Sequence, residues 1–342
     1  MDKFIVFPYS IGTSYLNAEN VKDNLILVGE RIQENNPERL YILFEKAIKN
    51  NPDIESILLI DSFQDVDKRI YVNAANVAKS NGKNVYASEA IYAALKNRGI
   101  NFINRLQGDN GHKVITKPET LHIIEKPVIA VFGMGENTEK FKIQLGLCDA
   151  LHKFGYNVLT IASNDLSSLL GLGSMPSFMY SEELSMKQKI WQFNSYVYQA
   201  IQSKNPDFVL IGVPGGITKY DRYIDAHYGE LAYIISQAVE IDYAITSFYY
   251  NPMLNAEFLE YMDNFVANHL GLYIDKYVIS PTTCTFDSEN RVVSYNYYLN
   301  DYYDEYYPKI AYDNRIVNFY KIDYAEIVKN IVGKLSSNFS VV

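Results

Sequence analysis

The chain has little cysteine, a single tryptophan and no long apolar segment. Its 342 residues include two cysteines, Cys148 and Cys284, which excludes a disulfide framework and a four-cysteine metal site. No apolar run approaches the roughly 20 residues that span a bilayer. The N-terminal residues lack the apolar core and small-residue cleavage site of a secretory signal. These absences predict a cytoplasmic protein with no membrane segment.

Basic residues are in the minority. Lys and Arg number 31 against 40 Asp and Glu, the net charge is −9, and no basic block interrupts the sequence. A nucleic-acid surface needs an excess of positive charge, so nucleic acid is not an expected partner. The five histidines form no HxH or HxxxH pair, and no metal site can be read from the sequence.

The sequence does contain short apolar runs that alternate with amphipathic segments. In the first third, strands are expected at 4–7, 57–60 and 85–87, and helices at 37–50, 70–80 and 88–98. Further strands are expected at 128–132, 157–162, 208–212, 243–248 and 277–280. Such alternation favours parallel, doubly wound sheets. We expect two α/β domains, a Rossmann-like domain at 1–125 and a second parallel-sheet domain at 126–342.

The most informative segment begins at Lys126 and reads KPVIAVFGMGENTEKFKIQLGLCDAL. An apolar strand ends at Gly133, a Gly-x-Gly turn follows, and an amphipathic helix begins near Lys140. A strand, a glycine turn and a helix in this order direct backbone N–H groups at a phosphate. The spacing from Gly133 to Lys140 resembles a P-loop, so Gly133, Gly135 and Lys140 are candidate phosphate-binding residues.

The same segment departs from a P-loop in ways that argue against hydrolysis of Mg-ATP. Glu139 stands where glycine precedes the lysine, which puts a carboxylate where a phosphate should rest. Phe141 replaces the hydroxyl that binds Mg²⁺, and Gly212 stands where an acidic residue would help to hold that ion. Two interpretations stay open. The loop holds a phosphate-bearing ligand without metal, or it is a relic turn in which Lys140 pairs with Glu136 or Glu139.

A glycine pair, a histidine and the two cysteines are further candidates for a functional role. Gly215 and Gly216 follow a buried strand, at the edge where α/β folds bind ligands, and should face the Gly133 loop. They allow a ligand close to the backbone or serve the turn alone. Gly215, Gly216 and His227 are candidate ligand-binding residues, and His227 is either a general base or metal ligand, or else a helix-cap or packing residue. Cys148 is expected in the core, and Cys284 is expected to be the more accessible thiol.

Tyrosine is abundant near the C-terminus. Of the 30 tyrosines, eight crowd the segment SYNYYLNDYYDEYYPKIAY, where they alternate with acidic residues. Tyrosine combines a large apolar area with a polar tip, so an acidic tyrosine surface suits a basic or extended peptide. The alternative is an ordinary hairpin over 292–312, with a turn near 300–305, whose tyrosines cover the sheet. The candidate peptide-binding residues are Tyr297, Tyr298, Tyr302, Tyr303, Tyr306 and Tyr307.

Two motifs carry a resemblance to a known family. FGMGENTEKFKIQLGLCDAL at 132–151 and PDFVLIGVPGGI at 206–217, together with SMPSFM at 174–179, resemble the clostridial peptide maturation system protein family. That family is encoded beside radical-SAM maturases and small ribosomal precursor peptides. The resemblance implies an accessory protein that binds the precursor peptide, the maturase, or both. A homodimer stays open.

A more distant resemblance is to the two-domain P-loop family that includes D-glutamate N-acetyltransferase. It implies a Rossmann-like domain followed by a P-loop domain of the dethiobiotin-synthetase type, with Lys140 matching the P-loop lysine and Gly133 its first glycine. The alternative function that it implies is a transferase whose glycine loop binds the phosphates of an acyl-CoA or a nucleotide. CoA or a nucleotide is therefore the cofactor to test, and none is certain.

Overall fold

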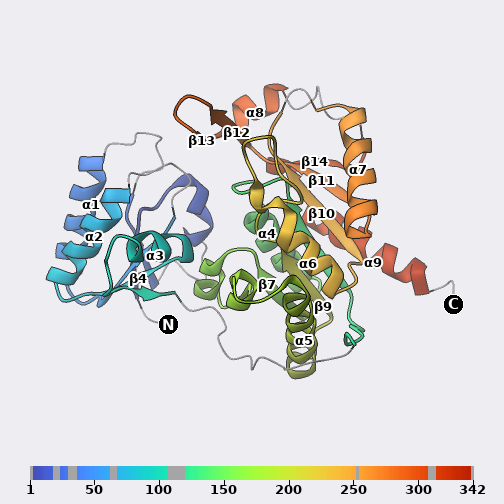
Figure 1. Cartoon of the computed structure of the whole chain (residues 1–342), viewed down its shortest axis with the longest axis horizontal. Helices are drawn as coiled ribbons and strands as arrows, with labels where there is room; N and C mark the ends of the chain where they lie inside the picture. The colour runs from blue at the N-terminus through green and yellow to red at the C-terminus, as the bar shows by residue number, and fades with distance from the viewer. Residues whose placement is uncertain are drawn as a thin grey trace. The chain divides into compact units, whose positions relative to one another are not determined.

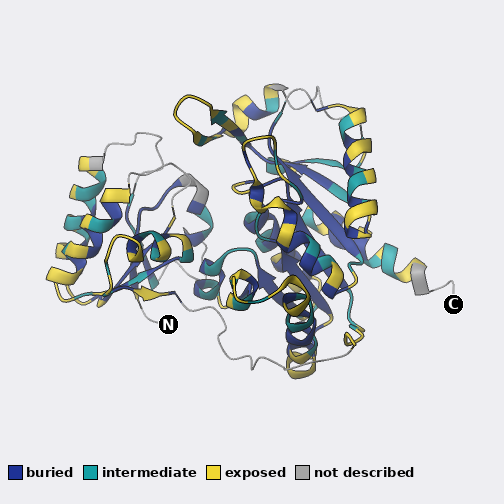
Figure 2. Ribbon diagram, in the orientation of Figure 1, coloured by how far each residue is buried: buried dark blue, intermediate teal, exposed yellow. Residues whose placement is uncertain are grey.

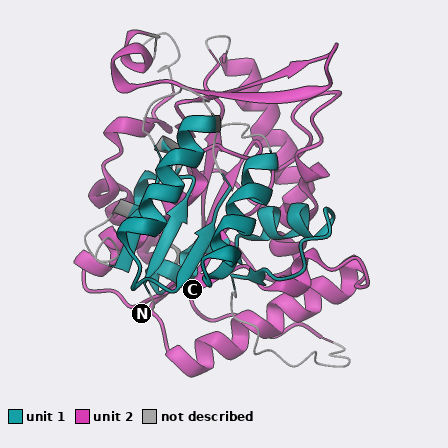
Figure 3. Cartoon of the chain, turned by 90° about the vertical axis from the view of Figure 1, so that its left-hand side faces the viewer, with its two compact units in different colours: residues 1–107, 165–171 teal, residues 108–164, 172–342 magenta. Residues whose placement is uncertain are grey.

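The computed structural model describes residues 3–17, 24–29, 37–61, 68–106, 120–251, 254–306 and 313–339. The chain divides into two compact units (Figure 3). Unit 1 comprises residues 1–107 and 165–171, and unit 2 comprises residues 108–164 and 172–342. The boundary predicted at residue 125 therefore lies inside unit 2. The second contribution to unit 1, at 165–171, has no counterpart in the sequence prediction.

Unit 1 is built on a parallel five-stranded sheet with the strand order β2-β1-β3-β4-β5. Its strand β4 and its three helices are labelled in Figure 1. Its parallel strands and connecting helices form the Rossmann-like arrangement that the alternating pattern predicts. The strands are β1 (Phe4–Phe7), β2 (Leu25–Leu27), β3 (Ser56–Leu59), β4 (Asn84–Ala87) and β5 (Asn104–Arg105), and the helices are α1 (Pro37–Asn50), α2 (Lys68–Ser80) and α3 (Glu89–Lys96).

The two faces of the unit 1 sheet are covered differently. Helices α1, α2 and α3 pack on one face, where Phe44 and Ala74 join the cluster around Ile57. The other face is covered by two 3-10 segments, η1 (Ile11–Asn17) and η3 (Asp165–Leu170). The segment 165–171 thus supplies core residues where a doubly wound sheet would have helices, which explains why it belongs to unit 1.

Unit 2 is built on a parallel seven-stranded sheet with the order β14-β11-β10-β6-β9-β7-β8. Its central strands are buried along their whole length (Figure 2), as expected of a parallel sheet covered on both faces. The strands are β6 (Val128–Gly133), β7 (Val158–Ala162), β8 (Gly173–Ser174), β9 (Phe208–Gly212), β10 (Tyr243–Phe248), β11 (Lys276–Ile279) and β14 (Ile316–Asn318).

Helices cover both faces of the unit 2 sheet. Ala130 and Phe132 of β6 belong to the core beneath α5, α6 and α7, whereas Ile129 and Val131 belong to the core beneath α4 and α9. This alternation follows from the two-residue period of a strand. The helices are α4 (Lys140–Lys153), α5 (Met186–Lys204), α6 (Glu230–Ala238), α7 (Ala256–Leu270) and α9 (Tyr324–Phe339).

The tyrosine-rich segment differs from its prediction. Strands β12 (Thr282–Asp287) and β13 (Val292–Tyr297) form an antiparallel hairpin that turns before residue 292. The expected turn near 300–305 is wrong, because that region forms helix α8 (Asn300–Tyr306). Asp301 lies in its first turn, where a negative charge stabilises a helix. Residues 307–312 lie outside the described part of the chain.

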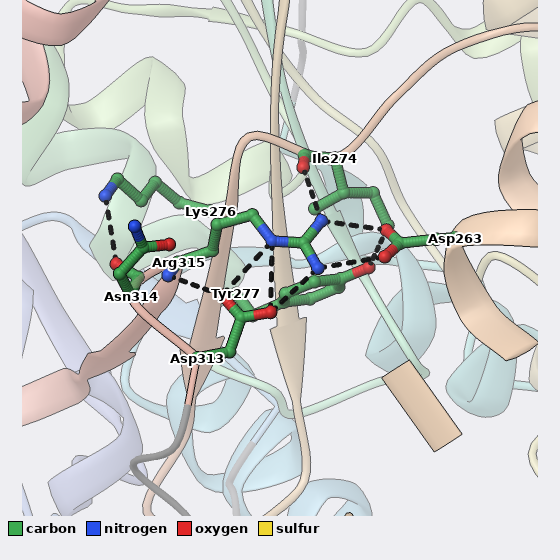
Figure 4. Close-up of polar contacts among 7 residues, drawn as sticks. All are labelled: Asp263, Ile274, Lys276, Tyr277, Asp313, Asn314 and Arg315. Atoms are coloured by element: carbon green, nitrogen blue, oxygen red, sulfur yellow. Dashed lines mark hydrogen bonds and ion pairs between the residues drawn. The ribbon is translucent and has the colours of Figure 1, made fainter. Parts of the chain in front are cut away.

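Arg315 clamps the edge of the unit 2 sheet (Figure 4). Its terminal nitrogens donate to both carboxylate oxygens of Asp263 on α7, at 3.0 and 2.9 Å, and its Nη2 also donates to Asp313 at 2.9 Å. Its Nε donates to Asp313 as well, and the guanidinium lies 5.0 Å from the ring centre of Tyr277. Every guanidinium nitrogen has a protein partner, so Arg315 serves the structure rather than a ligand.

Candidate functional site

The candidate site lies where three adjacent strands of unit 2 reach their carboxyl ends. Strand β6 pairs with β9 on one side and with β10 on the other. The N–H of Ile217 donates to the carbonyl of Gly133 at 2.9 Å, and the N–H of Met134 donates to Ser247 at 2.9 Å. A Cβ on Gly216 would lie 2.7 Å from the carbonyl oxygen of Met134. The glycine turn after β9 therefore packs directly on the loop after β6, as expected from the sequence.

Lys140 is buried at the first position of α4. Its ammonium donates to the carbonyl oxygens of Gly135 and Gly215, the latter at 2.8 Å. Burial lowers the pKa of Lys140 to about 8, and the negative charge of Glu136 partly offsets that effect. The lysine that a P-loop points at phosphate thus holds the loop and the neighbouring turn together. The ion pairs expected for a relic turn are absent from this described site, since Glu136 pairs with His227 and Glu139 with Lys142.

Glu139 has a backbone conformation that is typical of glycine. Its φ is +62°, a left-handed conformation that glycine adopts without steric cost and other residues rarely adopt. Its carboxylate is buried and pairs with Lys142 at 2.7 Å. The same charge helps to raise the pKa of Tyr297 and Tyr324, whose shifts come first from burial. The expectation of a carboxylate in the phosphate position is therefore corrected, because the side chain lies with Lys142 and these tyrosines.

Neighbouring groups hold the loop after β6 tightly. A Cβ on Gly133 would lie 2.4 Å from Oγ1 of Thr138, so only glycine fits where the loop folds back. Ser247 Oγ donates to the carbonyl of Thr138, and the Tyr249 hydroxyl donates to that of Glu136, both at 2.5 Å. Ser247 and Tyr249 were not predicted as loop contacts. Their signal is positional, because they lie on either side of the last residue of β10, the strand that pairs with β6.

The positions that would hold Mg²⁺ are filled by other groups. Phe141 is buried on α4. A Cβ on Gly212 would lie 2.3 Å from Oε1 of Gln144, whose Nε2 donates to the carbonyls of Ile161 and Leu210 at 3.0 and 3.3 Å. The buried amide of Gln144 therefore takes the space beside Gly212. Across the described residues, no group of three or more His, Cys, Asp or Glu side chains could hold a metal ion.

His227 reaches the loop from a strained turn. Residues 226–229 all have positive φ, and each non-glycine residue in that region costs about 1–2 kcal/mol. His227 Nε2 lies 3.0 Å from Oε1 of Glu136, and the Asp225 carboxylate accepts a hydrogen bond from the backbone N–H of His227 at 2.8 Å. The hydrogen bond raises the pKa of His227 and lowers that of Glu136. The structure thus brings His227 to the loop through a partner, Glu136, that the sequence analysis did not assign to it.

The two cysteines are both buried. Cys148 lies on α4 and packs in the hydrophobic core, as expected, with its Sγ 3.3 Å from Oγ1 of Thr160. Burial raises the pKa of Cys148 and also raises that of Cys284, to about 11. Cys284 is the more exposed of the two thiols, as expected, at 8% against 4% for Cys148, but it too is buried and lies near Tyr249 and Tyr295. Neither thiol has the low pKa of a nucleophile.

Two of the four candidate tyrosines whose side chains are described lie in the core. Tyr297 and Tyr303 are buried, and the Tyr303 hydroxyl donates to the carbonyl of Ile279, so these two candidates cannot form an exposed peptide surface. Tyr298 is half-buried and stacks on Tyr302 at 4.8 Å. Tyr302 is 46% exposed. The side chain of Tyr306 and all of Tyr307 lie outside the described residues.

Comparison with known proteins finds distant likenesses among solved structures. No family model matches the chain, and no curated protein matches it. Among solved structures, a DUF1611 family protein from Anabaena variabilis has 10% identity and a TM-score of 0.49, over 85% of this chain and 82% of that one. A plasmid partition protein from Borrelia burgdorferi has 13% identity and a TM-score of 0.34, over 62% and 99%.

The signal recognition particle receptor FtsY from Elizabethkingia anophelis has 13% identity and a TM-score of 0.30, over 73% of this chain and 82% of that one. The fold itself is α/β, with a parallel five-stranded sheet in unit 1 and a parallel seven-stranded sheet in unit 2. In the described part of the chain, no helix has the length and apolarity needed to cross a membrane.

Proposed function

We propose that the protein is an accessory protein of a ribosomal peptide maturation system. It binds the precursor peptide, the partner radical-SAM maturase, or both, and it does not hydrolyse Mg-ATP. The peptide part of this proposal is supported by the resemblance of the motifs at 132–151 and 206–217 to the peptide maturation family. The part that concerns ATP is supported by the geometry of the loop after β6.

The observation that carries the part of the proposal concerning ATP is the hydrogen bonding of Lys140. Its ammonium is buried and donates to the carbonyls of Gly135 and Gly215, so phosphate has to compete with two existing hydrogen bonds. Phe141 supplies no metal ligand, and Gln144 blocks an acidic side chain at position 212. Phosphoryl transfer depends on Mg²⁺ that neutralises the developing charge. This set of side chains therefore does not favour hydrolysis of Mg-ATP.

Co-purification tests the proposal. The tagged protein is expressed with the precursor peptide and the radical-SAM maturase that the resemblance implies as its partners, and phosphate release from Mg-ATP is measured on the same preparation. We expect the peptide, the maturase or both to co-purify, with phosphate release no faster than in buffer. Failure of both partners to bind would overturn the accessory role. Phosphate release that disappears in Lys140→Met would overturn the absence of hydrolysis.

The alternative is a transferase that binds the phosphates of acyl-CoA or a nucleotide without metal. One observation favours it: the backbone of a phosphate loop persists, since Glu139 keeps a left-handed φ and its carboxylate pairs with Lys142. Calorimetry with acetyl-CoA, ATP and GTP in EDTA distinguishes the two functions. Tight binding that Lys140→Met abolishes would establish the alternative, and the absence of binding by all three ligands would reject it.

A further inference from the structure

A hollow of about 690 Å³ opens at the edge of unit 2 where the strands begin. It is lined by the segment 121–124, by the last residues of α6 and α7, by the 240–242 connection into β10, and by Lys334 of α9. The loop after β6 follows the carboxyl end of its strand, so the hollow is a separate place on the same unit. Its volume is in the range of ligand-binding pockets.

The rim of the hollow is apolar and exposed. Ile123 is 81% exposed and Tyr273 is 78% exposed, and both line the hollow together with Leu121. Deeper in the hollow, Val239 and Leu272 are buried. Exposed apolar side chains gathered around a concave surface mark binding sites more often than scattered ones do. An occupant of this hollow therefore brings apolar groups of its own.

The charge of the hollow is negative. Glu240 and Asp242 both line it, and their mutual repulsion adds to the burial that raises the pKa of Asp242. Helices α6 and α7 end here, and a helix C-terminus carries a partial negative charge. Lys334 contacts Asp275 at 2.7 and 2.9 Å, and its charge offsets part of the repulsion at Asp242. Asp242 also accepts a hydrogen bond from the backbone N–H of Val128 at 2.8 Å. Glu240 is exposed, so a cation entering the hollow would pair with Glu240 and relieve its repulsion with Asp242.

We propose that this hollow binds a peptide segment in which a Lys or Arg lies beside aliphatic residues. The aliphatic groups pack on Ile123 and Tyr273, and the cation lies near Glu240 and Asp242 and the carbonyl ends of α6 and α7. This assignment rests on the proposed function and names the surface and the chemistry of the peptide. It replaces the tyrosine surface predicted from the sequence, two residues of which lie in the core.

The test uses the full chain and a fluorescein-labelled probe of sequence Ala-Leu-Lys-Ile-Lys-Leu-Ala, followed by fluorescence anisotropy. Ile123→Glu and Tyr273→Ala should each weaken binding by about tenfold or more, as loss of an anchor side chain does. The matched controls are Ile42→Glu and Tyr261→Ala, which change exposed side chains elsewhere and should bind as the wild type does. Because all four side chains are exposed, circular dichroism should show unchanged folding.

Charge is tested separately. Glu240→Lys should weaken the basic probe and improve binding of a probe in which both lysines are replaced by glutamate, whereas Glu260→Lys should change neither. Equal binding of the basic and acidic probes by the wild type would overturn the assignment, as would unchanged binding in Ile123→Glu. A dimer that Ile123→Glu dissociates, without probe binding by the wild type, would show instead that a second copy covers the hollow.

The precursor peptide itself separates failure of this assignment from failure of the proposed function. If it binds the wild type and Ile123→Glu with equal affinity, the hollow is not its site and the accessory role stands. If it binds neither protein and the maturase also fails to bind, the proposed function falls with the assignment.

Discussion

Lys140 donates a hydrogen bond of 2.8 Å to the carbonyl oxygen of Gly215. This bond joins the loop after β6 to the turn after β9 through the side chain that a P-loop uses for phosphate. Two carbonyl oxygens replace the water of the ammonium without supplying a full negative charge, which explains the lowered pKa of Lys140. An anionic ligand at this loop competes with those carbonyls.

The first prediction concerns the pH dependence of stability. A buried lysine with a pKa of about 8 binds fewer protons than the unfolded chain between pH 8 and its ordinary value near 10.5, so its contribution improves as the pH rises. The destabilising effect of the charge is largest at neutral pH. The unfolding free energy of Lys140→Met minus that of the wild type should therefore be larger at pH 7 than at pH 9.5, by about 2 kcal/mol.

Urea denaturation at the two pH values measures this difference. Lys153→Met, on the exposed face of the same helix, is the control and should show no comparable change. A difference between Lys140→Met and the wild type that stays constant with pH would contradict a desolvated ammonium at position 140.

The second prediction concerns the conformation of Glu139. Both Glu139→Gly and Glu139→Ala remove the carboxylate and leave Lys142 without it, so the two variants differ only in how they accept a φ of +62°. Glycine should be the more stable by about 1 kcal/mol, because a Cβ is strained in the left-handed region. Thermal or urea unfolding of the pair measures the difference. Equal stability would show that position 139 does not keep the backbone of a glycine.

The third prediction concerns the contact between Glu136 and His227. It contributes only while His227 is protonated and Glu136 is ionised, so it is lost as the pH rises through the raised pKa of His227 and as it falls through the lowered pKa of Glu136. NMR titration of the imidazole should show that Glu136→Gln lowers the pKa of His227. Glu182→Gln, at the surface, should leave that titration unchanged. An identical His227 pKa in the wild type and Glu136→Gln would rule out the contact.

The fourth prediction concerns Arg315. Arg315→Lys keeps the charge but cannot reproduce the paired bonds to Asp263 and Asp313 or the contact with Tyr277. We expect a loss of about 2 kcal/mol in unfolding free energy. Lys153→Ala removes an exposed ion pair with Asp149 and should cost less than about 0.5 kcal/mol. If the two substitutions cost the same, Arg315 is an ordinary surface residue.

Much of the fold follows from local patterns in the sequence. Strand β1 and helix α1 have the predicted bounds, because a buried tetrapeptide before Pro8 and a 3.6-residue period after Pro37 leave few alternatives. The meeting of the Gly133 loop and the Gly215 turn could also be predicted, since adjacent parallel strands end at the same edge. Segment 165–171 could not, because its apolar residues do not reveal which sheet they cover.

The chemistry of the site was less accessible to sequence analysis. The Glu139 side chain lies with Lys142 because of a left-handed backbone, and residue identity does not reveal that conformation. The contact between Glu136 and His227 joins positions 91 residues apart through a turn with three non-glycine residues at positive φ. In the tyrosine-rich segment, the amino-acid composition is the same for a binding surface and for a core. Only the packing in the structure shows that Tyr303 belongs to the core.

One calorimetric titration tests the central claim most directly. The precursor peptide is titrated into the wild type and into Lys140→Met with Mg-ATP present, and phosphate is measured at the end of each run. We expect the same peptide affinity for both proteins and no phosphate above the buffer blank. Absence of peptide binding, together with phosphate that the wild type releases and Lys140→Met does not, would contradict that claim.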